Sequence, residues 1–285
     1  MADTTAASPA LVNAAALAEA DVIRPVWPVS PGVGALMTTR AGGVSTGAWA
    51  SLNLGRAVGD APAAVKENRR RFAASLALPP RPDRRERGVA GNAAMADATP
   101  ARPVWLQQVH GTAVIELDAS TPEHATEPAD AAWTRTPGIA CVVGAADCLP
   151  VLFAVRDGSA VAAAHAGWRG LAAGVLEAAV HALAHGAAVQ PADLVAWLGP
   201  CIGPRRFEVG ADVLLAFGVE PAEAGEELPP HFRYAPRPDG APRWHADLQA
   251  LARVGSPRSA SAPWSPTSAA PTRMLRPSPS ARRRP

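Results

Sequence analysis

Short apolar runs separated by glycine and proline turns occupy the middle of the chain, and this pattern predicts a mixed α/β fold. The runs lie at residues 140–144, 151–155, 160–164 and 194–198. Their length is typical of buried strands. Asp157-Gly158 separates the second run from the third, and an Asp-Gly pair in this position is typical of a β-hairpin. We expect a mixed sheet with flanking helices, layered as a sandwich in a single domain.

Helical periodicity appears in three places. Apolar residues recur at helical spacing over residues 61–76, with Asp60 as the expected N-cap. Residues 171–185 follow a glycine-rich turn, and Gly186 is placed to end that helix. A last helix is predicted to open at residues 247–252.

The folded domain is expected between two terminal segments of different composition. Residues 1–25 begin with an Ala-, Thr- and Ser-rich stretch and are interpreted as a flexible leader. The strand and helix patterns fill residues 26–253, with a polar, Pro- and Arg-rich surface excursion at 79–103. Residues 254–285 hold six Arg and no acidic residue, and their Ser-, Pro- and Ala-rich composition predicts a disordered tail.

Charge and cysteine content narrow the class of protein. The net charge is +2, and the six Arg of the tail leave the preceding residues near −4. That sign argues against nucleic-acid binding by the body of the chain. Three Cys without paired spacing indicate a reducing compartment. The start of the chain has no secretory pattern, and the apolar runs fall short of the roughly 18 residues of a membrane span. We therefore expect a cytoplasmic protein.

Three metal-competent side chains, His110, Cys148 and His165, occur next to predicted strands. Each could therefore be held at one edge of a sheet. Two imidazoles and one thiolate form a three-ligand zinc set, which leaves a fourth tetrahedral position for water or substrate. The spacing alone leaves a bland interpretation open, in which Cys148 is a small buried hydrophobe. The remaining histidines are interpreted as structural: His124, His181, His185, His231 and His245.

Ordered motifs over roughly residues 26–253 carry a family resemblance. They are Thr38-Thr-Arg40-Ala-Gly-Gly-Val-Ser-Thr-Gly47, Ser51-Leu-Asn-Leu-Gly55, Glu67-Asn68-Arg69, Gln108-Val-His110-Gly, Ala129-Asp130-Ala, Ala146-Asp-Cys148-Leu-Pro150, His165-Ala-Gly-Trp-Arg169-Gly and Gly199-Pro-Cys-Ile-Gly-Pro204. In this order the motifs resemble the multicopper polyphenol oxidase/laccase-like family, whose members are also described as bacterial purine nucleoside phosphorylases.

The resemblance implies that His110, Cys148 and His165 hold zinc in a pocket, where Cys148 and His165 also serve catalysis. It implies phosphorolysis of adenosine, inosine and methylthioadenosine, together with adenosine deamination. Purine nucleosides and phosphate are the implied partners. Copper is claimed for the family, but multicopper chemistry needs many His ligands. Only His181 and His185 are four residues apart here, so laccase activity is not expected, and zinc is the metal that the resemblance implies.

Three further residues are candidates for the chemistry. Arg40 and Arg169 are expected to bind phosphate, because a guanidinium is a bidentate anion donor. Asp147 is expected to carry a proton or to orient a ligand. For all three, a structural salt bridge or a turn is the alternative role.

Two other functions stay open. One is a hydrolase that edits peptidoglycan precursors, with Cys148 as nucleophile and a His as base. The other is a non-catalytic binder whose basic tail, residues 254–285, contacts nucleic acid. Metal content distinguishes the hydrolase from the zinc enzyme, because a nucleophilic Cys does not require zinc.

The resemblance stops near Arg253. Family members normally continue with a helix, a strand, a Cys-Thr segment and an aromatic-Ser-Tyr-Arg-Arg stretch. Back-translation of residues 254–278 with GC-rich codons, read in a shifted frame, can give a helix, a strand and Cys-Thr. We therefore expect that residues 254–285 arise from a frameshift, which resequencing of the 3′ end of the gene would test.

Overall fold

The computed structural model describes residues 15–76, 101–222 and 225–255. Within them the chain divides into two compact units, each described here by itself. The first unit comprises residues 15–26, 31–76 and 101–103, and the second comprises residues 27–30, 104–222 and 225–255. The mixed α/β class is confirmed. The predicted domain boundaries at residues 26 and 253 stay predictions.

The first unit contains a short β-ribbon and one long helix. Strand β1 (Val22–Ile23) pairs antiparallel with β2 (Met37–Thr38). A 3₁₀ turn, η2 (Glu19–Asp21), precedes β1, and a second, η3 (Gly47–Trp49), follows β2. Strand β1 lies within residues 1–25, the segment interpreted as a flexible leader, and that interpretation stays a prediction. Residues 1–14 lie outside the described part of the chain.

Helix α1 (Pro62–Ala74) confirms the helix predicted over residues 61–76. The expected N-cap is wrong: Ala61 occupies that position, and Pro62 begins the helix with its preset φ. The Asp60 carboxylate instead accepts hydrogen bonds from Ser45 Oγ at 2.6 Å and Asn53 Nδ2 at 3.0 Å. These two hydrogen bonds connect distant residues of the loop that precedes helix α1.

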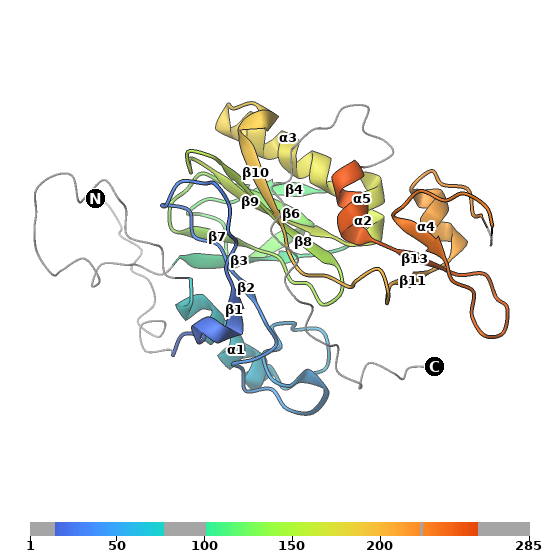
Figure 1. The fold of residues 1–285 in the computed structure, drawn as a ribbon. Coiled ribbons are helices and arrows are strands. Elements are labelled where there is room, and N and C mark those ends of the chain that lie inside the picture. Colours follow the sequence, from blue (N-terminus) through green and yellow to red (C-terminus); the bar gives the residue numbers. More distant parts are fainter. Residues whose placement is uncertain (1–14, 77–100, 223–224, 256–285) are drawn as a thin grey trace, which may run out of the picture. The chain divides into compact units, whose positions relative to one another are not determined.

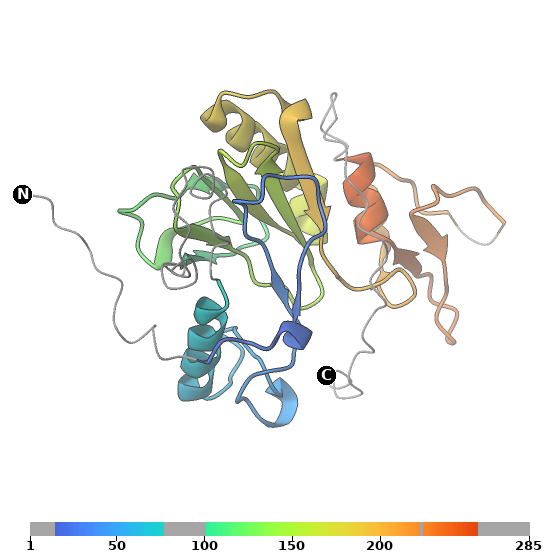
Figure 2. The same ribbon diagram turned by 60° about the vertical axis from the view of Figure 1, so that its left-hand side comes forward.

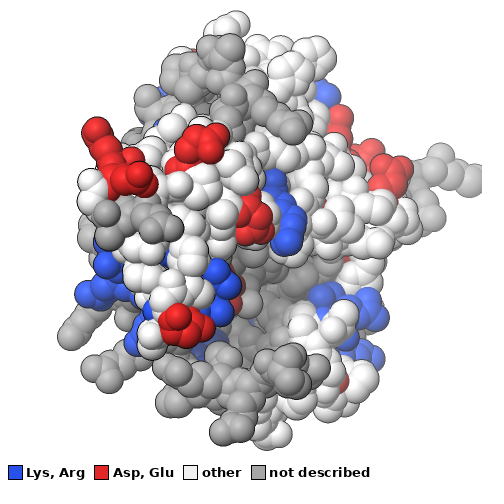
Figure 3. Space-filling model, turned by 90° about the vertical axis from the view of Figure 1, so that its right-hand side faces the viewer, with Lys and Arg blue, Asp and Glu red and all other residues white. Residues whose placement is uncertain are grey.

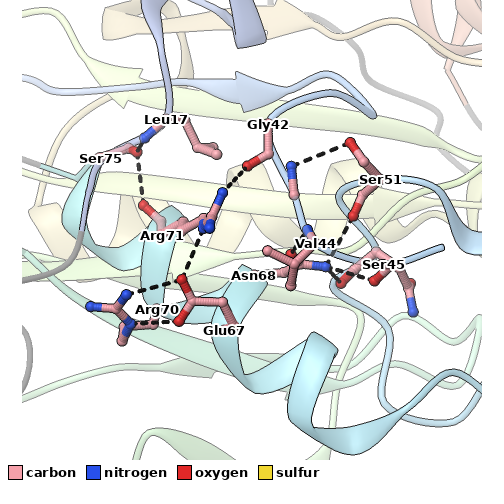
Figure 4. A network of polar contacts seen from close by, with 12 residues as sticks. Leu17, Gly42, Val44, Ser45, Ser51, Glu67, Asn68, Arg70, Arg71 and Ser75 are labelled. Atoms are coloured by element: carbon pink, nitrogen blue, oxygen red, sulfur yellow. Dashed lines mark hydrogen bonds and ion pairs between the residues drawn. The ribbon is translucent and has the colours of Figure 1, made fainter.

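A fully buried amide, Asn68, ties helix α1 to that loop (Figure 4). Its Oδ1 accepts from the Val44 N–H at 2.8 Å, and its Nδ2 donates to Ser45 Oγ at 2.8 Å and to the Asn53 carbonyl at 2.9 Å. Buried polar groups need such partners, because an unsatisfied one costs about 1–3 kcal/mol. Asn68 therefore connects the helix to three residues of the loop.

Helix α1 also carries an ion-pair cluster, drawn in Figure 4. Glu67 contacts Arg70 at 2.7 Å and Arg71 at 2.9 Å, one turn along the helix. Arg71 in turn donates to the Gly42 carbonyl at 3.0 Å. The cluster links the helix to a second point of the loop.

The second unit is built on a five-stranded sheet in the order β10-β8-β9-β6-β4. Its strands are β4 (Val114–Glu116), β6 (Ala131–Thr134), β8 (Leu149–Val155), β9 (Val161–Ala166) and β10 (Leu194–Leu198). The β4–β6 pair is parallel and the other pairs are antiparallel. Strands β8 and β9 form the hairpin that the Asp-Gly turn predicts, in a register that places Pro150 opposite His165.

Helices cover one face of this sheet. Helix α2 (Trp168–Ala173) leads directly into α3 (Val175–Ala187), which lies across the sheet in Figures 1 and 2. The prediction of one helix over residues 171–185 is wrong, because Gly174 adopts φ 99° and breaks it. Gly186 does not end the helix either. It lies inside α3, where an added Cβ would come within 2.1 Å of the Trp133 ring.

Two smaller sheets complete the described chain. One has the order β5-β3-β7, with β5 (His124–Pro128), β3 (Arg102–Gln107) and β7 (Ile139–Val142). The other has the order β11-β13-β12, with β11 (Glu208–Val209), β13 (Trp244–Ala246) and β12 (Phe232–Tyr234). Three short helical elements remain. The 3₁₀ turn η5 (Pro191–Asp193) precedes β10, helix α4 (Ala211–Ala216) follows β11, and helix α5 (Leu248–Val254) follows β13. The last helix confirms the prediction at residues 247–252, and Asp247 caps it by accepting from the Ala250 N–H.

Charges of both signs meet on the β11-β13-β12 sheet. Glu208 contacts Arg237 and Arg243, and Arg233 donates to His245 across the same sheet. On the side of the molecule seen in Figure 3, acidic and basic side chains are interspersed with larger uncharged areas. None of the helices in the described part of the chain is long and apolar enough to cross a membrane.

Candidate metal centre

His110, Cys148 and His165 come together in the second unit. His110 follows β3, Cys148 immediately precedes β8, and His165 is the penultimate residue of β9. Their potential ligand atoms all lie within 4.8 Å of one another. Cys148 Sγ is 3.8 Å from His110 Nε2, and the two imidazole rings meet edge to face with centroids 4.8 Å apart. The arrangement is a group of donors that could hold one metal ion.

A buried carboxylate, Asp130, lies behind two of these side chains. It directly precedes β6 and is completely inaccessible to solvent. Asp130 Oδ1 is 2.8 Å from His165 Nδ1 and accepts the His110 N–H at 2.9 Å. Oδ2 accepts the N–H groups of Val109 at 3.1 Å and Gly111 at 2.6 Å. The carboxylate therefore contacts one ligand through its ring and the other through its backbone.

Gly167 allows the three donors to approach one another. An added Cβ at this position would lie 2.6 Å from His110 Cδ2 and 3.1 Å from Cys148 Sγ. Gly170 is close to the same loop, because its added Cβ would lie 2.9 Å from the Gly111 carbonyl oxygen. The glycines of the sequence after His165 thus provide space for the centre rather than flexibility.

The protonation states follow from burial and from Asp130. Burial lowers the pKa of His165, although its contact with Asp130 opposes the shift, so the imidazole is neutral at pH 7. Burial alone would raise the pKa of Asp130, but hydrogen bonds from His165, Gly111, Val109 and His110 outweigh it, and the pKa is lowered. The carboxylate is therefore ionised.

The pKa of Cys148 shifts in the opposite direction to that of Asp130. Burial, followed by the negative charges of Asp147 and Asp130, raises the pKa of its thiol. Without a cation nearby, the thiol is the stable form. A bound metal would supply the positive charge that favours the thiolate. Neutral imidazole and thiolate donors suit zinc and similar borderline or soft ions, so the residues present fit a zinc ion.

The other predicted site residues lie in different surroundings. Asp147 is exposed next to Cys148, and its backbone carbonyl accepts from the Ile202 N–H at 2.9 Å. Arg169 is exposed in the first turn of α2, with its guanidinium 4.3 Å from the Trp168 ring centroid. Arg40 belongs to the first unit, where its guanidinium donates to the Ala50 carbonyl. The roles proposed for these three residues stay predictions.

Asp130 is the residue that sequence reasoning missed as a contributor to the centre. The motif Ala129-Asp130-Ala is part of the family resemblance, whereas the residue predicted to carry a proton or to orient a ligand is Asp147. A usable signal was present: Asp130 begins the apolar stretch Ala131-Ala-Trp133. A carboxylate that enters a buried strand needs several donors, and it therefore indicates a polar centre at that strand end.

Comparison of the sequence with known protein families identifies the family of this chain. The profile of the family described as multi-copper polyphenol oxidoreductase laccase matches residues 34–84 and 81–255. The chain belongs to this family. The resemblance inferred from the motifs is therefore confirmed.

The match ends at residue 255, and residues 256–285 lie outside the described part of the structure, so the frameshifted, disordered tail stays a prediction. Residues 77–100, which hold most of the predicted excursion, also lie outside it.

Relatives in this family carry an enzyme's name. Purine nucleoside phosphorylase PA4543 of Pseudomonas aeruginosa is 46% identical over 232 residues, which is 81% of this chain and 80% of that protein. Purine nucleoside phosphorylase YfiH of Escherichia coli is 44% identical over 81% of each chain. Among solved structures, NMB0706 of Neisseria meningitidis is 40% identical with a TM-score of 0.59, over 82% of this chain and 81% of that one.

Proposed function

We propose that this protein is a zinc-dependent purine nucleoside phosphorylase that cleaves adenosine, inosine and methylthioadenosine, with adenosine deaminase activity at the same centre. One observation carries the proposal: His110, Cys148 and His165 converge within 4.8 Å. They do so in a chain that is 44–46% identical to proteins named purine nucleoside phosphorylase. A nucleoside-processing enzyme is the function that both findings support.

His110, Cys148 and His165 would hold the zinc. When bound, it would supply a Lewis acid able to polarise an oxygen of phosphate or a substituent of the purine. Among the residues that the structure describes, this is the one group of at least three His, Cys, Asp or Glu that could hold a metal. A multicopper centre needs many more His ligands, which argues against the multicopper chemistry of the family's name.

Tasks in phosphorolysis are proposed for three polar residues. A phosphate oxygen forms a bond to the sugar C1′ while the bond from C1′ to the purine nitrogen breaks, and the electron pair leaves with the base. Arg169 is proposed to bind the phosphate, because its exposed guanidinium lies four residues beyond His165. Arg40 is proposed as a second phosphate ligand. Asp147, exposed beside Cys148, is proposed to carry a proton to the leaving purine.

Deamination requires water instead of phosphate as the attacking group. The exocyclic amine of adenosine then leaves as ammonia, and the product is inosine. Asp147 would transfer the proton from water to the departing amine. The two reactions thus differ in the nucleophile and in the carbon attacked, and the presence of phosphate distinguishes them.

One observation favours a second candidate, a hydrolase with Cys148 as nucleophile that edits peptidoglycan precursors. Cys148 Sγ lies 3.8 Å from His110 Nε2, a spacing that could tighten into a nucleophile–base pair. The electrostatics oppose it, because burial and Asp147 raise the pKa of the thiol. Metal content separates the two candidates.

The deciding experiment incubates purified protein of measured zinc content with adenosine, with and without phosphate, and separates the products by chromatography. Adenine formed only with phosphate supports phosphorolysis, and inosine formed in either buffer supports deamination. Cys148→Ala should abolish both products, whereas Cys141→Ala, which removes a thiol in β7, should leave both unchanged. Folded, zinc-loaded protein that forms no product would overturn the proposal.

A further inference from the structure

The Asp130 carboxylate accepts four hydrogen bonds, two on each oxygen. Oδ1 contacts the His110 N–H and His165 Nδ1, and Oδ2 contacts the N–H groups of Val109 and Gly111. An ionised carboxylate is an acceptor only, so all four contacts are satisfied when every partner donates. An asparagine could not reproduce them, because its NH₂ group would face donors on one side.

These contacts determine which nitrogen of His165 can bind a metal. Its Nδ1 must carry the proton, since Nδ1 is the donor to a carboxylate. The lone pair of the neutral ring is then on Nε2. In metal sites, a carboxylate on one ring nitrogen is a common way to direct the other nitrogen to the ion. Asp130 thereby selects the tautomer before any metal arrives.

The same carboxylate holds the loop of the second ligand. His110 adopts φ 61°, a left-handed conformation that a residue with a side chain seldom takes. Successive N–H groups around such a residue converge to form a concavity that binds anions. In this protein the Asp130 carboxylate occupies the concavity, with the N–H groups of residues 109, 110 and 111 all donating to it.

We propose that Asp130 is a positioning residue that presets His110 and His165 for the metal. It fixes the backbone of one and the tautomer of the other. The inference rests on the proposed function only in taking the centre to hold zinc. Its tests require no nucleoside turnover, so its failure and the failure of the proposed enzyme activity are distinguishable.

Zinc affinity gives the first test, measured by competition with a chromophoric chelator. Asp130→Asn should weaken zinc binding by about 10- to 100-fold, the usual effect of removing such a partner. Thr134→Val is the matched control: Thr134 is a buried polar residue at the far end of β6, the strand that Asp130 precedes, and its hydroxyl donates to the Leu117 carbonyl. This variant should be less stable to heat but should retain zinc affinity within about twofold. Equal affinity losses in both variants, or none in Asp130→Asn, would overturn the proposal.

Nitrogen NMR of histidine provides the second test, on the metal-free wild-type protein. His165, assigned by its absence from a His165→Gln variant, should show a protonated Nδ1 and an unprotonated Nε2. The opposite tautomer would overturn the proposal even if Asp130→Asn failed to fold. In a folded Asp130→Asn protein, the His165 signal should lose its preference for the Nδ1–H tautomer, which a merely structural role of Asp130 would leave intact.

Discussion

At the scale of single residues, two buried polar side chains each organise a loop that has little regular structure of its own. Asn68 satisfies backbone and hydroxyl groups of residues 44–53 in the first unit. Asp130 satisfies the backbone of residues 109–111 in the second. In both cases one side chain, in helix α1 or directly before strand β6, provides hydrogen bonds that strand pairing does not. The backbone conformation of each loop thus depends on a side chain that is about 20 residues away in the sequence.

Glu67 gives a prediction at this scale. Hydrogen bonds from Arg70 and then Arg71 lower the pKa of its carboxyl from 4.5 to about 2. A pKa that is lower in the folded state stabilises the protein above pH 4.5, and this contribution disappears as pH falls toward 2. Wild type should therefore lose unfolding free energy relative to Glu67→Gln between these pH values.

The measurement is chemical denaturation at several pH values, followed by circular dichroism. The gap between wild type and Glu67→Gln should be widest near neutral pH and close near pH 2. A gap that stays constant throughout this range would show that the ion pairs with Arg70 and Arg71 do not contribute in solution.

The sequence predicted the three candidate ligands but not the residue behind them. His110, Cys148 and His165 are chemically conspicuous, and each adjoins an apolar run or a family motif. The contacts of Asp130 depend on the left-handed turn at His110 and on the pairing of β6 with β9. Both are set by tertiary structure, so the spacing of residues along the chain contains no direct trace of them.

At the scale of elements, the hairpin was predictable from a local sequence signal, whereas the break between the two helices was not. The β8–β9 hairpin is local and its Asp-Gly turn is explicit, so its prediction was correct. The break between α2 and α3 arises at Gly174, a small residue in a pattern whose apolar positions continue across it. The strands of the β11-β13-β12 sheet have two or three residues each and pair across long loops. Neither feature produces a periodic signal.

Gly186 gives the prediction at this scale. In an exposed helix, Gly→Ala usually stabilises by about 1 kcal/mol. In α3 the new methyl group would overlap the buried ring of Trp133, so Gly186→Ala should lower the melting temperature.

A double-mutant cycle with Trp133→Leu tests the cause. The smaller side chain removes the overlap, so Gly186→Ala should become neutral or stabilising in that background. The same destabilisation in both backgrounds would contradict an origin in the contact with Trp133.

At the scale of the whole molecule, the chain divides into two units, and all three candidate ligands belong to the second. A ligand that binds only the folded state stabilises it, by about 2.7 kcal/mol at a concentration of one hundred times its Kd. The stabilisation should therefore be visible in the elements next to the centre.

Hydrogen exchange with and without zinc measures this effect. Amides of β6, β8 and β9 should exchange more slowly in the zinc-loaded protein, and chelation should reverse the change. Cys148→Ala, which lacks one ligand, should show little protection on addition of the same zinc concentration. Equal protection in the variant would show that zinc binds elsewhere.

The strand order of the five-stranded sheet limits how early in protein synthesis the three candidate ligands can come together. His110, Asp130, Cys148 and His165 are made in that order, and the last arrives in β9, which must insert between β8 and β6. A nascent chain that ends before residue 165 lacks the second imidazole and the end of β9 that carries it. A metal ion could therefore be bound by all three side chains only after residue 165 has been synthesised. By then the chain already contains the sequences of β4, β6 and β8, so metal binding would come late relative to the synthesis of most of this sheet.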